Sequence, residues 1–568
     1  MEFSGHPAVR LLTPEPLQLA FAFTSLGIAF HLCIRTVEVD YRLWRLLGLY
    51  LVSWSSLAVA YNTIFGLGLL HAVGIASFAG VCFHTGLALS ITIYRLLFHR
   101  LRNFPGPLGA KLSRFYAVKL ASKNLQYHLE LQGLHRKYGD FVRTGPREIS
   151  VIRPSAVQTI HGSKSACLRS TWYSQVSDDV TKISLNSTRN PDVHRRRKRA
   201  WDRGFSIKAL SIYEPRVRSK VDVLVSQLRA RLGQPINIAE WTMFLSFDVM
   251  GQIGFDKDFH QLEEAKEHSA IAGLHAQMAV LGLLSPLPWL LSFLGSIPGL
   301  TGSYALFMDY CAKQVEEAKA KWQPGSDENP TSVISWLLKA KDENDQSAPP
   351  GDGALDEDGR LIIIAGSDTT GVTLANALYF LIKNPPVYKK LQTQLDSIFP
   401  VGDSSCTYDK IRDIPYLDAV INETLRLKPA VPSGQPRVTP PDGLQIDDVW
   451  IPGDINVITP QYVIQRDERN FPRGEEYVPE RWLAEEKKAM IFHEQAFFPF
   501  QIGPYGCVGK QLALMQLRWT ISLVALNFDI SLAPGEDGVS FDQGAKDTFT
   551  FSVSPLQMKF QTRTKSNI

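Results

Sequence analysis

The first hundred residues are dominated by long apolar stretches of the kind that forms membrane helices. Residues 16–34 are predominantly apolar, and no Asp, Glu, Lys or Arg occurs from Leu46 to Tyr94. A helix that crosses a bilayer needs about 20 apolar residues, so the second stretch is long enough for two crossings with a turn near residues 61–68. The pattern predicts three transmembrane helices, with one or two crossings as the alternative.

Arginines follow the first and third predicted spans. They are Arg35, Arg42 and Arg45, then Arg95, Arg100 and Arg102. Because basic loops stay in the cytosol, we expect the first residues in the lumen and everything after residue 95 in the cytosol. The competing interpretation is a cleaved signal peptide followed by buried helices, but no small-residue cleavage site follows the first stretch.

A proline-rich hinge, Phe104-Pro105-Gly106-Pro107, closes the apolar region. These residues cannot continue a helix, so we expect a membrane anchor over residues 1–103 and a second domain over residues 104–568. That domain is predicted to be mainly α with a small β part. The patterns indicate helices over 381–399, 417–427 and 509–526, strands over 147–153 and 444–451, and a loop over 342–359.

A strongly apolar run interrupted by three prolines covers residues 278–301. One interpretation is a pair of short core helices. The other is a lid over a substrate channel that dips into the membrane, with Trp289 and Phe293 as its anchors.

Composition adds two limits. The net charge is +4, with 60 basic and 56 acidic side chains, so no nucleic-acid partner is indicated. Six cysteines are scattered without paired spacing, which is typical of reduced thiols in a cytosol-facing domain.

One cysteine has a distinctive setting. Residues 500–510 read FQIGPYGCVGK, so that Cys507 lies among Gly503, Gly506 and Gly509 just before a predicted helix. Glycines let a backbone approach a flat cofactor closely. A thiolate at this junction faces the positive end of the helix dipole, which favours its charged, metal-binding form.

The spacing F-x-x-G-x-x-x-C-x-G resembles the haem-ligand loop of the cytochrome P450 family. The resemblance implies that Cys507 is the axial ligand to the iron of haem b, iron protoporphyrin IX. It also implies that Phe500, Gly503, Tyr505 and Gly509 surround this cofactor. The fold it implies is the cytochrome P450 fold, preceded here by an N-terminal transmembrane anchor.

A second motif, Ala365-Gly366-Ser367-Asp368-Thr369-Thr370, resembles the oxygen-activating helix of the same family. A carboxylate and a hydroxyl inside an apolar helical run make poor sense as plain core. The resemblance implies that Asp368 and Thr369 are catalytic and deliver protons to bound oxygen.

A third resemblance concerns buried charge. Glu423 and Arg426 share one helix face, which by itself indicates a surface pair of about 0.3 to 0.5 kcal/mol. In the family a second arginine, here Arg481 of Pro479-Glu480-Arg481-Trp482, joins them in a buried structural network.

Cofactor-binding cations are the least distinctive part of the pattern. By resemblance Arg437, His194 and Lys198 would hold the haem propionates, although the basic run HRRRKR at 194–199 is equally typical of a solvated surface. The sequence also departs from its family at Tyr505, where members usually have an arginine that pairs with a propionate.

Together the motifs resemble microsomal fungal members of the family. The implied function is a haem-dependent monooxygenase that inserts one oxygen atom of O2 into a lipophilic substrate, with fungal secondary-metabolite biosynthesis as the expected setting. Alternatives are a xenobiotic-oxidising monooxygenase and a non-catalytic membrane haem sensor. The chain has no flavin or dinucleotide fingerprint, so electrons are expected from NADPH-cytochrome P450 reductase. We expect an endoplasmic-reticulum location among membrane lipids, and a pocket lined by 166–182, 278–302, 430–435 and 547–551.

Overall fold

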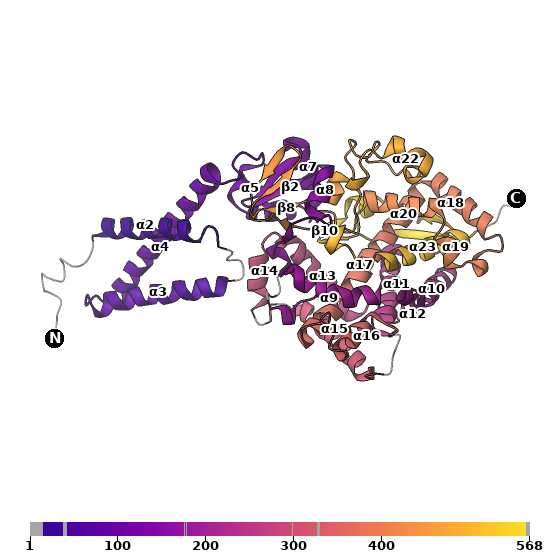
Figure 1. Ribbon diagram of the computed structural model, residues 1–568, viewed down its shortest axis with the longest axis horizontal. Coiled ribbons are helices and arrows are strands. Elements are labelled where there is room, and N and C mark those ends of the chain that lie inside the picture. Colours follow the sequence, from indigo (N-terminus) through magenta and orange to yellow (C-terminus); the bar gives the residue numbers. More distant parts are fainter. Residues whose placement is uncertain are drawn as a thin grey trace.

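Three apolar helices project from the rest of the protein. The computed structural model describes residues 15–37, 42–174, 177, 179–297, 299–300, 302–325 and 330–563. The projecting helices are α2 (Pro16–Ile34), α3 (Leu43–Thr63) and α4 (Leu69–Ile93), at the indigo end of the ribbon (Figure 1). Each is long and apolar enough to cross a membrane, in agreement with the hydropathy pattern.

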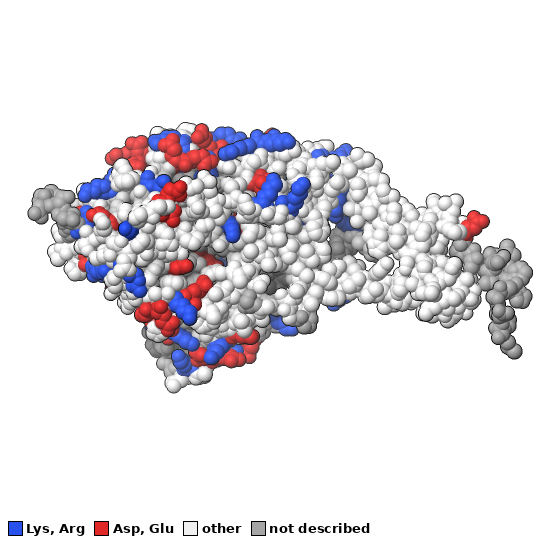
Figure 2. All heavy atoms as spheres, turned by 180° about the vertical axis from the view of Figure 1, so that it is seen from behind, with Lys and Arg blue, Asp and Glu red and all other residues white. Residues whose placement is uncertain are grey.

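Close backbone contact joins α2 to α4. A Cβ added to Gly27 would lie 2.1 Å from the Phe83 carbonyl oxygen, and one added to Gly86 would lie 2.0 Å from that of Thr24. Small residues at such crossings let apolar helices pack where no hydrophobic driving force acts between them. Figure 2 shows that the charged side chains gather on the large domain and that this projection carries few of them.

The remaining described residues form a largely helical domain (Figure 1). Its helices are α5 (Leu108–Leu112), α6 (Phe115–Ala121), α7 (Tyr127–Tyr138), α8 (Pro154–His161), α9 (Pro191–Gly204), α10 (Ile207–Arg229), α11 (Ile238–Phe255), α12 (Gln261–Glu264), α13 (Ser269–Leu284), α14 (Pro288–Gly295), α15 (Gly302–Lys321), α16 (Val333–Asp342), α17 (Asp352–Lys383), α18 (Pro385–Ile398), α19 (Tyr408–Ile411), α20 (Pro415–Leu427), α21 (Gln461–Ile464), α22 (Ala484–Met490), α23 (Lys510–Asn527) and α24 (Val539–Gln543).

The strands form small sheets at the edges of the helical mass. They are β1 (Phe141–Gly145), β2 (Glu148–Val151), β3 (Leu168–Arg169), β4 (Ile236–Asn237), β5 (Arg437–Val438), β6 (Leu444–Ile446), β7 (Val449–Ile451), β8 (Asn456–Ile458), β9 (Phe528–Leu532), β10 (Lys546–Thr548), β11 (Thr550–Ser552) and β12 (Gln557–Thr562). One sheet has the order β1-β2-β8-β5-β3 and another β4-β12-β9, while β6-β7 and β10-β11 are hairpins. The predicted class, mainly α with a small β part, is confirmed.

Helix α17 runs through the centre of this domain. It is also apolar enough to cross a membrane, but 72% of its apolar window is buried inside the protein, against 6% to 28% for the three projecting helices. It packs against α11, α15 and α23. Its apolar character therefore belongs to the protein core.

The predicted helix over residues 381–399 is wrong in its start. Helix α17 continues to Lys383, Asn384 is not helical, and α18 begins at Pro385. A proline disfavours helical backbone at the residue before it, and here two prolines follow Asn384. They separate two helices that one apolar periodicity had joined.

Two shorter predictions also need correction. Helix α17 begins at Asp352, inside the predicted loop 342–359, where an aspartate in the first turn suits the helix dipole. The stretch 444–451 is not one strand but the hairpin β6-β7, whose turn contains Asp447 at a φ of 50°. The proline-broken run 278–301 forms the end of α13 and the short helix α14.

The three charged residues of the predicted structural network lie together and are fully buried. Glu423 accepts hydrogen bonds from Arg426 at 2.9 Å and from Arg481 at 3.0 Å, and also from the Trp482 indole and the Val478 amide. Backbone carbonyls take the other donors of both arginines. Burial alone would raise the pKa of Glu423, but the two arginines hold it below its ordinary value.

We predict that Glu423→Gln destabilises the domain by about 3 to 5 kcal/mol, because two buried guanidinium groups lose their shared carboxylate. Since the folded pKa of Glu423 is depressed, its contribution exists above the unfolded pKa and disappears as pH falls through the folded value. Urea unfolding at neutral and acidic pH measures both effects. Glu480→Gln is the matched control: its carboxylate pairs with Lys390 in a half-exposed position, so about 1 kcal/mol or less is expected. Equal losses in the two variants would contradict the prediction.

Candidate active site

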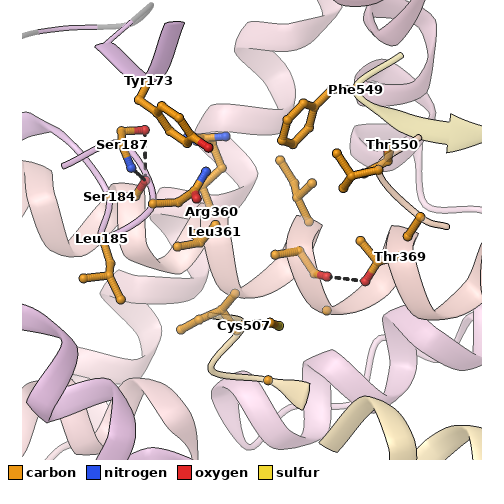
Figure 3. Close-up of a pocket in the computed structure, with 18 of the residues that line it drawn as sticks. Tyr173, Ser184, Leu185, Ser187, Arg360, Leu361, Thr369, Cys507, Phe549 and Thr550 are labelled. Atoms are coloured by element: carbon orange, nitrogen blue, oxygen red, sulfur yellow. Dashed lines mark hydrogen bonds between the residues drawn. The ribbon is translucent and has the colours of Figure 1, made fainter. Parts of the chain in front are cut away.

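A cavity of about 1180 Å³ lies at the centre of the domain. The Cys507 loop forms one wall, and α17 passes beside it with Thr369 toward the cavity (Figure 3). The opposite end is closed by Tyr173 and Phe549, which point inward (Figure 3).

The loop brings the Cys507 thiol into the cavity wall. A short 3₁₀ turn, Gly503–Tyr505, precedes it and α23 begins three residues after it. The Cys507 amide donates to the Phe500 carbonyl at 2.8 Å, which closes the loop. Burial raises the pKa of the thiol; hydrogen bonds from the backbone N–H groups of Gly509 and Lys510 oppose that rise. The predicted N–H groups at the helix terminus are therefore present, but burial has the larger effect on the pKa of the Cys507 thiol.

The loop glycines serve different purposes. Gly503 has a φ of 68°, and a Cβ there would lie 2.3 Å from the His161 carbonyl oxygen, so only glycine fits. Gly509 has a negative φ, and a Cβ there would make only ordinary contacts at 3.8 Å or more. Phe500, Tyr505 and Gly509 line the cavity, whereas Gly503 packs against the backbone of His161 and Gly162.

Tyr505 lies among positively charged groups. The Arg169 guanidinium is 4.4 Å from the centre of its ring and the Arg437 guanidinium is 4.9 Å from it. The His194 ring is 4.7 Å from the Tyr505 ring. Arg437 also donates to the Tyr173 hydroxyl at 2.8 Å.

Arg169 lies inside the predicted pocket segment 166–182, but its role as a cation beside Tyr505 was not predicted. It reaches the cluster because β3 pairs with β5 in a register that sets Arg169 directly opposite Arg437. No local motif contains this information, since the two residues are far apart in the chain. Only the pairing of β3 with β5 shows that Arg169 lies beside Arg437.

The two arginines carry uncompensated charge. Arg169 is 5% exposed and Arg437 is 1% exposed, and neither forms an ion pair with a carboxylate in the described part of the chain. The Nε atom of each also lacks a hydrogen-bond partner. Burial, with neighbouring cations contributing, lowers the pKa of Arg169 to about 10 and that of His194 to about 2. The two buried guanidinium groups fit an anionic group such as a haem propionate, and the neutral His194 ring can donate a hydrogen bond to it.

Lys198, the other predicted propionate ligand, also lines the cavity. It forms an ion pair with Asp202, one turn further along α9. Because that pair already compensates its charge, Lys198 differs from Arg169 and Arg437. The basic run at 194–199 is thus divided: His194 is buried at the cavity, and Arg195 is exposed beside Asp192.

The predicted catalytic pair faces two directions from α17. Thr369 lines the cavity and donates to the Ala365 carbonyl at 2.7 Å, the bond dashed in Figure 3. Asp368 is buried and lies 3.6 Å from the Nε2 atom of His275 on α13. Gly366 is needed for packing, because a Cβ there would lie 2.3 Å from the Met250 sulfur.

More segments line the cavity than the sequence predicted. Each of the four predicted segments contributes, through residues such as Trp172, Leu281, Val431 and Phe549, but residues 184–187 and one face of α17, from Arg360 to Thr373 and without Asp368, line it as well. Phe549, at the tip of the β10-β11 hairpin, has a φ of 83° and stacks on Trp172 at 4.5 Å. A positive φ in a bulky residue is a strained conformation that often marks functional sites.

Comparisons with known proteins agree with this geometry. The chain is 40% identical over 502 residues to the cytochrome P450 monooxygenase orf5 of Eupenicillium brefeldianum, covering 88% of this chain and 99% of the relative. It is 37% identical over 546 residues to the cytochrome P450 monooxygenase FCK2 of Fusarium pseudograminearum, covering 95% and 97%. It is 32% identical over 576 residues to the tryprostatin B 6-hydroxylase of Aspergillus fumigatus, covering 98% and 99%.

The fold has a solved counterpart in the cytochrome P450DA haem domain, with a TM-score of 0.64, 18% identity and coverage of 78% of this chain and 94% of the other. The sequence pattern of the family described as Cytochrome P450 matches residues 105–560. With the cavity cysteine, the helix beside it and this match over most of its length, the chain belongs to the cytochrome P450 family and is a haem-dependent monooxygenase.

Proposed function

We propose that this monooxygenase holds haem b through the Cys507 thiolate. The observation that carries the proposal is the position of the Cys507 sulfur in the wall of the central cavity, beside α17. Arg169, Arg437 and His194 would hold the propionates around Tyr505. When bound, the haem supplies the activation of dioxygen, and the protein supplies orientation and proton traffic.

Thr369 and Asp368 divide that proton traffic. The Thr369 hydroxyl lies at the cavity and can hold water or oxygen there. Asp368 lies on the other side of the helix surface, within reach of α13. The pair therefore links the cavity to the outside of α17.

The substrate is proposed to be lipophilic. The wall opposite Cys507 is mainly apolar and aromatic, and the stacked Trp172 and Phe549 rings offer a flat surface to a planar group. The similar proteins come from fungi, and one is named for the hydroxylation of tryprostatin B. A role in fungal secondary metabolism follows as the best-supported biological setting.

Residues 1–103 are proposed to anchor the enzyme in the endoplasmic-reticulum membrane by three spans, with residues 104–568 in the cytosol. The three projecting apolar helices support this arrangement. Helix α3 also contacts α14: the Trp44 indole donates to the Ser296 hydroxyl at 2.6 Å and its ring lies 4.6 Å from the Phe293 ring. Ser296 lines the cavity, so the anchor touches the cavity wall directly.

Electrons are proposed to come from NADPH-cytochrome P450 reductase in the same membrane. The exposed basic residue Lys510 lies at the start of α23, close to the Cys507 loop. Such a charge suits an acidic docking partner, because complementary charges steer association.

Cys507→Ser tests the central assignment. A serine oxygen is a poor replacement for a thiolate, so the reduced variant is expected to lose the strongly red-shifted absorption of its carbon monoxide complex. Cys406→Ser is the matched control, because that thiol is buried elsewhere in the core. If the band persists in Cys507→Ser, another residue binds the iron.

The cations around Tyr505 should differ in their effect on haem retention. Arg169→Met and Arg437→Met each remove a buried charge, and we expect each to lower the haem-to-protein ratio after purification several-fold, on the basis of about 1.5 to 3 kcal/mol for a charged hydrogen bond. Tyr505→Phe removes only a hydroxyl and should keep most of the haem. A variant pattern in which Tyr505→Phe strips the haem while both arginine variants retain it would refute this division.

The topology has a separate test. A glycosylation acceptor sequence placed at residue 2 should be modified in microsomes, because three spans put that end in the lumen. The same tag placed after residue 563 should stay unmodified. An unmodified N-terminal tag would indicate an even number of spans.

A further inference from the structure

Three ionisable side chains form a line from the protein surface to α17. The Glu267 carboxylate lies 2.6 Å from Nδ1 of His275, and Nε2 of His275 lies 3.6 Å from Oδ1 of Asp368. The exposed fraction of the side chain falls along the line, from 36% for Glu267 through 32% for His275 to 5% for Asp368. The inner end is adjacent in sequence to Thr369, which lines the cavity.

The inner contact has an unusual geometry. His275 Nε2 and Asp368 Oδ1 are both buried, and neither has a hydrogen-bond partner. At 3.6 Å they are just beyond hydrogen-bonding distance from each other. Leaving two such buried atoms without a hydrogen bond costs free energy. A movement of less than 1 Å that brings the His275 ring and the Asp368 carboxylate together is therefore favourable, and a movement that separates them frees the carboxylate.

The surroundings of His275 favour its charged form. Besides His275, helix α13 has no charged side chain, and its polar side chains are Ser269 and Gln277. Phe247 on α11 lies 6.1 Å from the His275 ring. Among the described residues, the charged groups that face His275 are Glu267 and Asp368. Burial disfavours the imidazolium, but these two carboxylates together raise the pKa of His275 to about 10.

We propose that His275, fixed by Glu267, is the positioning residue of the Asp368–Thr369 pair. His275 holds the Asp368 carboxylate on the α13 side of α17, where this carboxylate exchanges protons with the surface through His275 and Glu267, and then releases it to turn toward Thr369. This inference rests on the proposed roles of Asp368 and Thr369, and it adds the residues that connect them to solvent.

Proton delivery affects which product forms from O2, hydrogen peroxide or water. Two electrons and two protons convert O2 to hydrogen peroxide, which needs one NADPH; four electrons and four protons convert it to two waters, which breaks the O–O bond and needs two NADPH. The electrons come from the reductase and the protons from solvent. Poor proton delivery therefore raises the share of consumed O2 that is released as peroxide.

The experiment uses the full-length enzyme with its reductase in microsomes, without added substrate, and measures NADPH, O2 and hydrogen peroxide together. We expect His275→Gln to raise the peroxide share at least about threefold and to increase the slowing of water formation in D2O. His275→Arg keeps the positive charge and should restore the wild-type share. His268→Gln is the matched control. It also removes an imidazole, at the residue just before α13, but the His268 ring contacts Tyr310 and not Asp368.

The pH profile separates this role from a purely structural one. Because the folded pKa of His275 is raised, the wild-type peroxide share should stay constant from pH 7 to about 9 and rise only as pH approaches 10. Glu267→Gln removes one of the two carboxylates that raise this pKa, so the rise should move to lower pH. His275→Arg should show no rise in this range.

Three outcomes would overturn the inference. His275→Gln could keep the wild-type peroxide share and D2O effect, His275→Arg could fail to restore them in a protein with a normal carbon monoxide spectrum, or the Glu267→Gln profile could match the wild type. The last result decides the matter if His275→Gln does not fold. Failure of the proposed function would look different: the wild type itself would lack the carbon monoxide band.

Discussion

The buried carboxylate of Glu423 holds the elements that position the cavity cysteine. Its two arginines tie α20 to the segment after α21, and Arg426 donates to the Gln465 carbonyl at 2.8 Å. The Gln465 side chain in turn bonds the last carbonyls of α20 and accepts from the Phe498 amide at 3.3 Å. Two residues later the Phe500 carbonyl receives the Cys507 amide. The links from Glu423 to Phe498 are buried and hydrogen-bonded, so the charge network determines the position of the loop that follows.

A second constraint is the charge that the cavity itself must balance. The family resemblance predicts an arginine where this chain has Tyr505, and two guanidinium groups lie over the Tyr505 ring from β3 and β5. A third cation in that position would face two like charges at close range, and an aromatic ring instead attracts both through its π face. Tyr505 is therefore compatible with Arg169 in a way that an arginine would not be. Tyr505 in place of the expected arginine and Arg169 over its ring therefore belong to one arrangement.

What the sequence predicted was local, and what it missed depended on tertiary pairing. The Cys507 loop, the Asp368-Thr369 segment and the helices at 415–427 and 510–527 are contiguous, so spacing and turn chemistry were sufficient to find them. The junction at Asn384 was missed because one apolar period crosses it, although Pro385 marks it plainly. Arg169 and His275 carry no motif, and each gains its meaning only from a partner more than 90 residues away, Arg437 and Asp368 respectively. No single-sequence pattern contains such pairs.

The helical period of α17 explains why its two adjacent polar residues can serve different surroundings. Successive side chains on a helix diverge by about 100°, so Thr369 meets the cavity while Asp368 meets α13. The hydroxyl can thus remain at the reacting side while the carboxylate exchanges protons with a water-accessible pair, and neither task opens the apolar cavity to bulk solvent. Helix α13 leads directly into α14, whose residues contact both α3 and the cavity. The proposed route for protons and the surface that contacts α3 therefore lie on consecutive helices, so a shift of these helices when substrate binds would reach His275 and the cavity wall together.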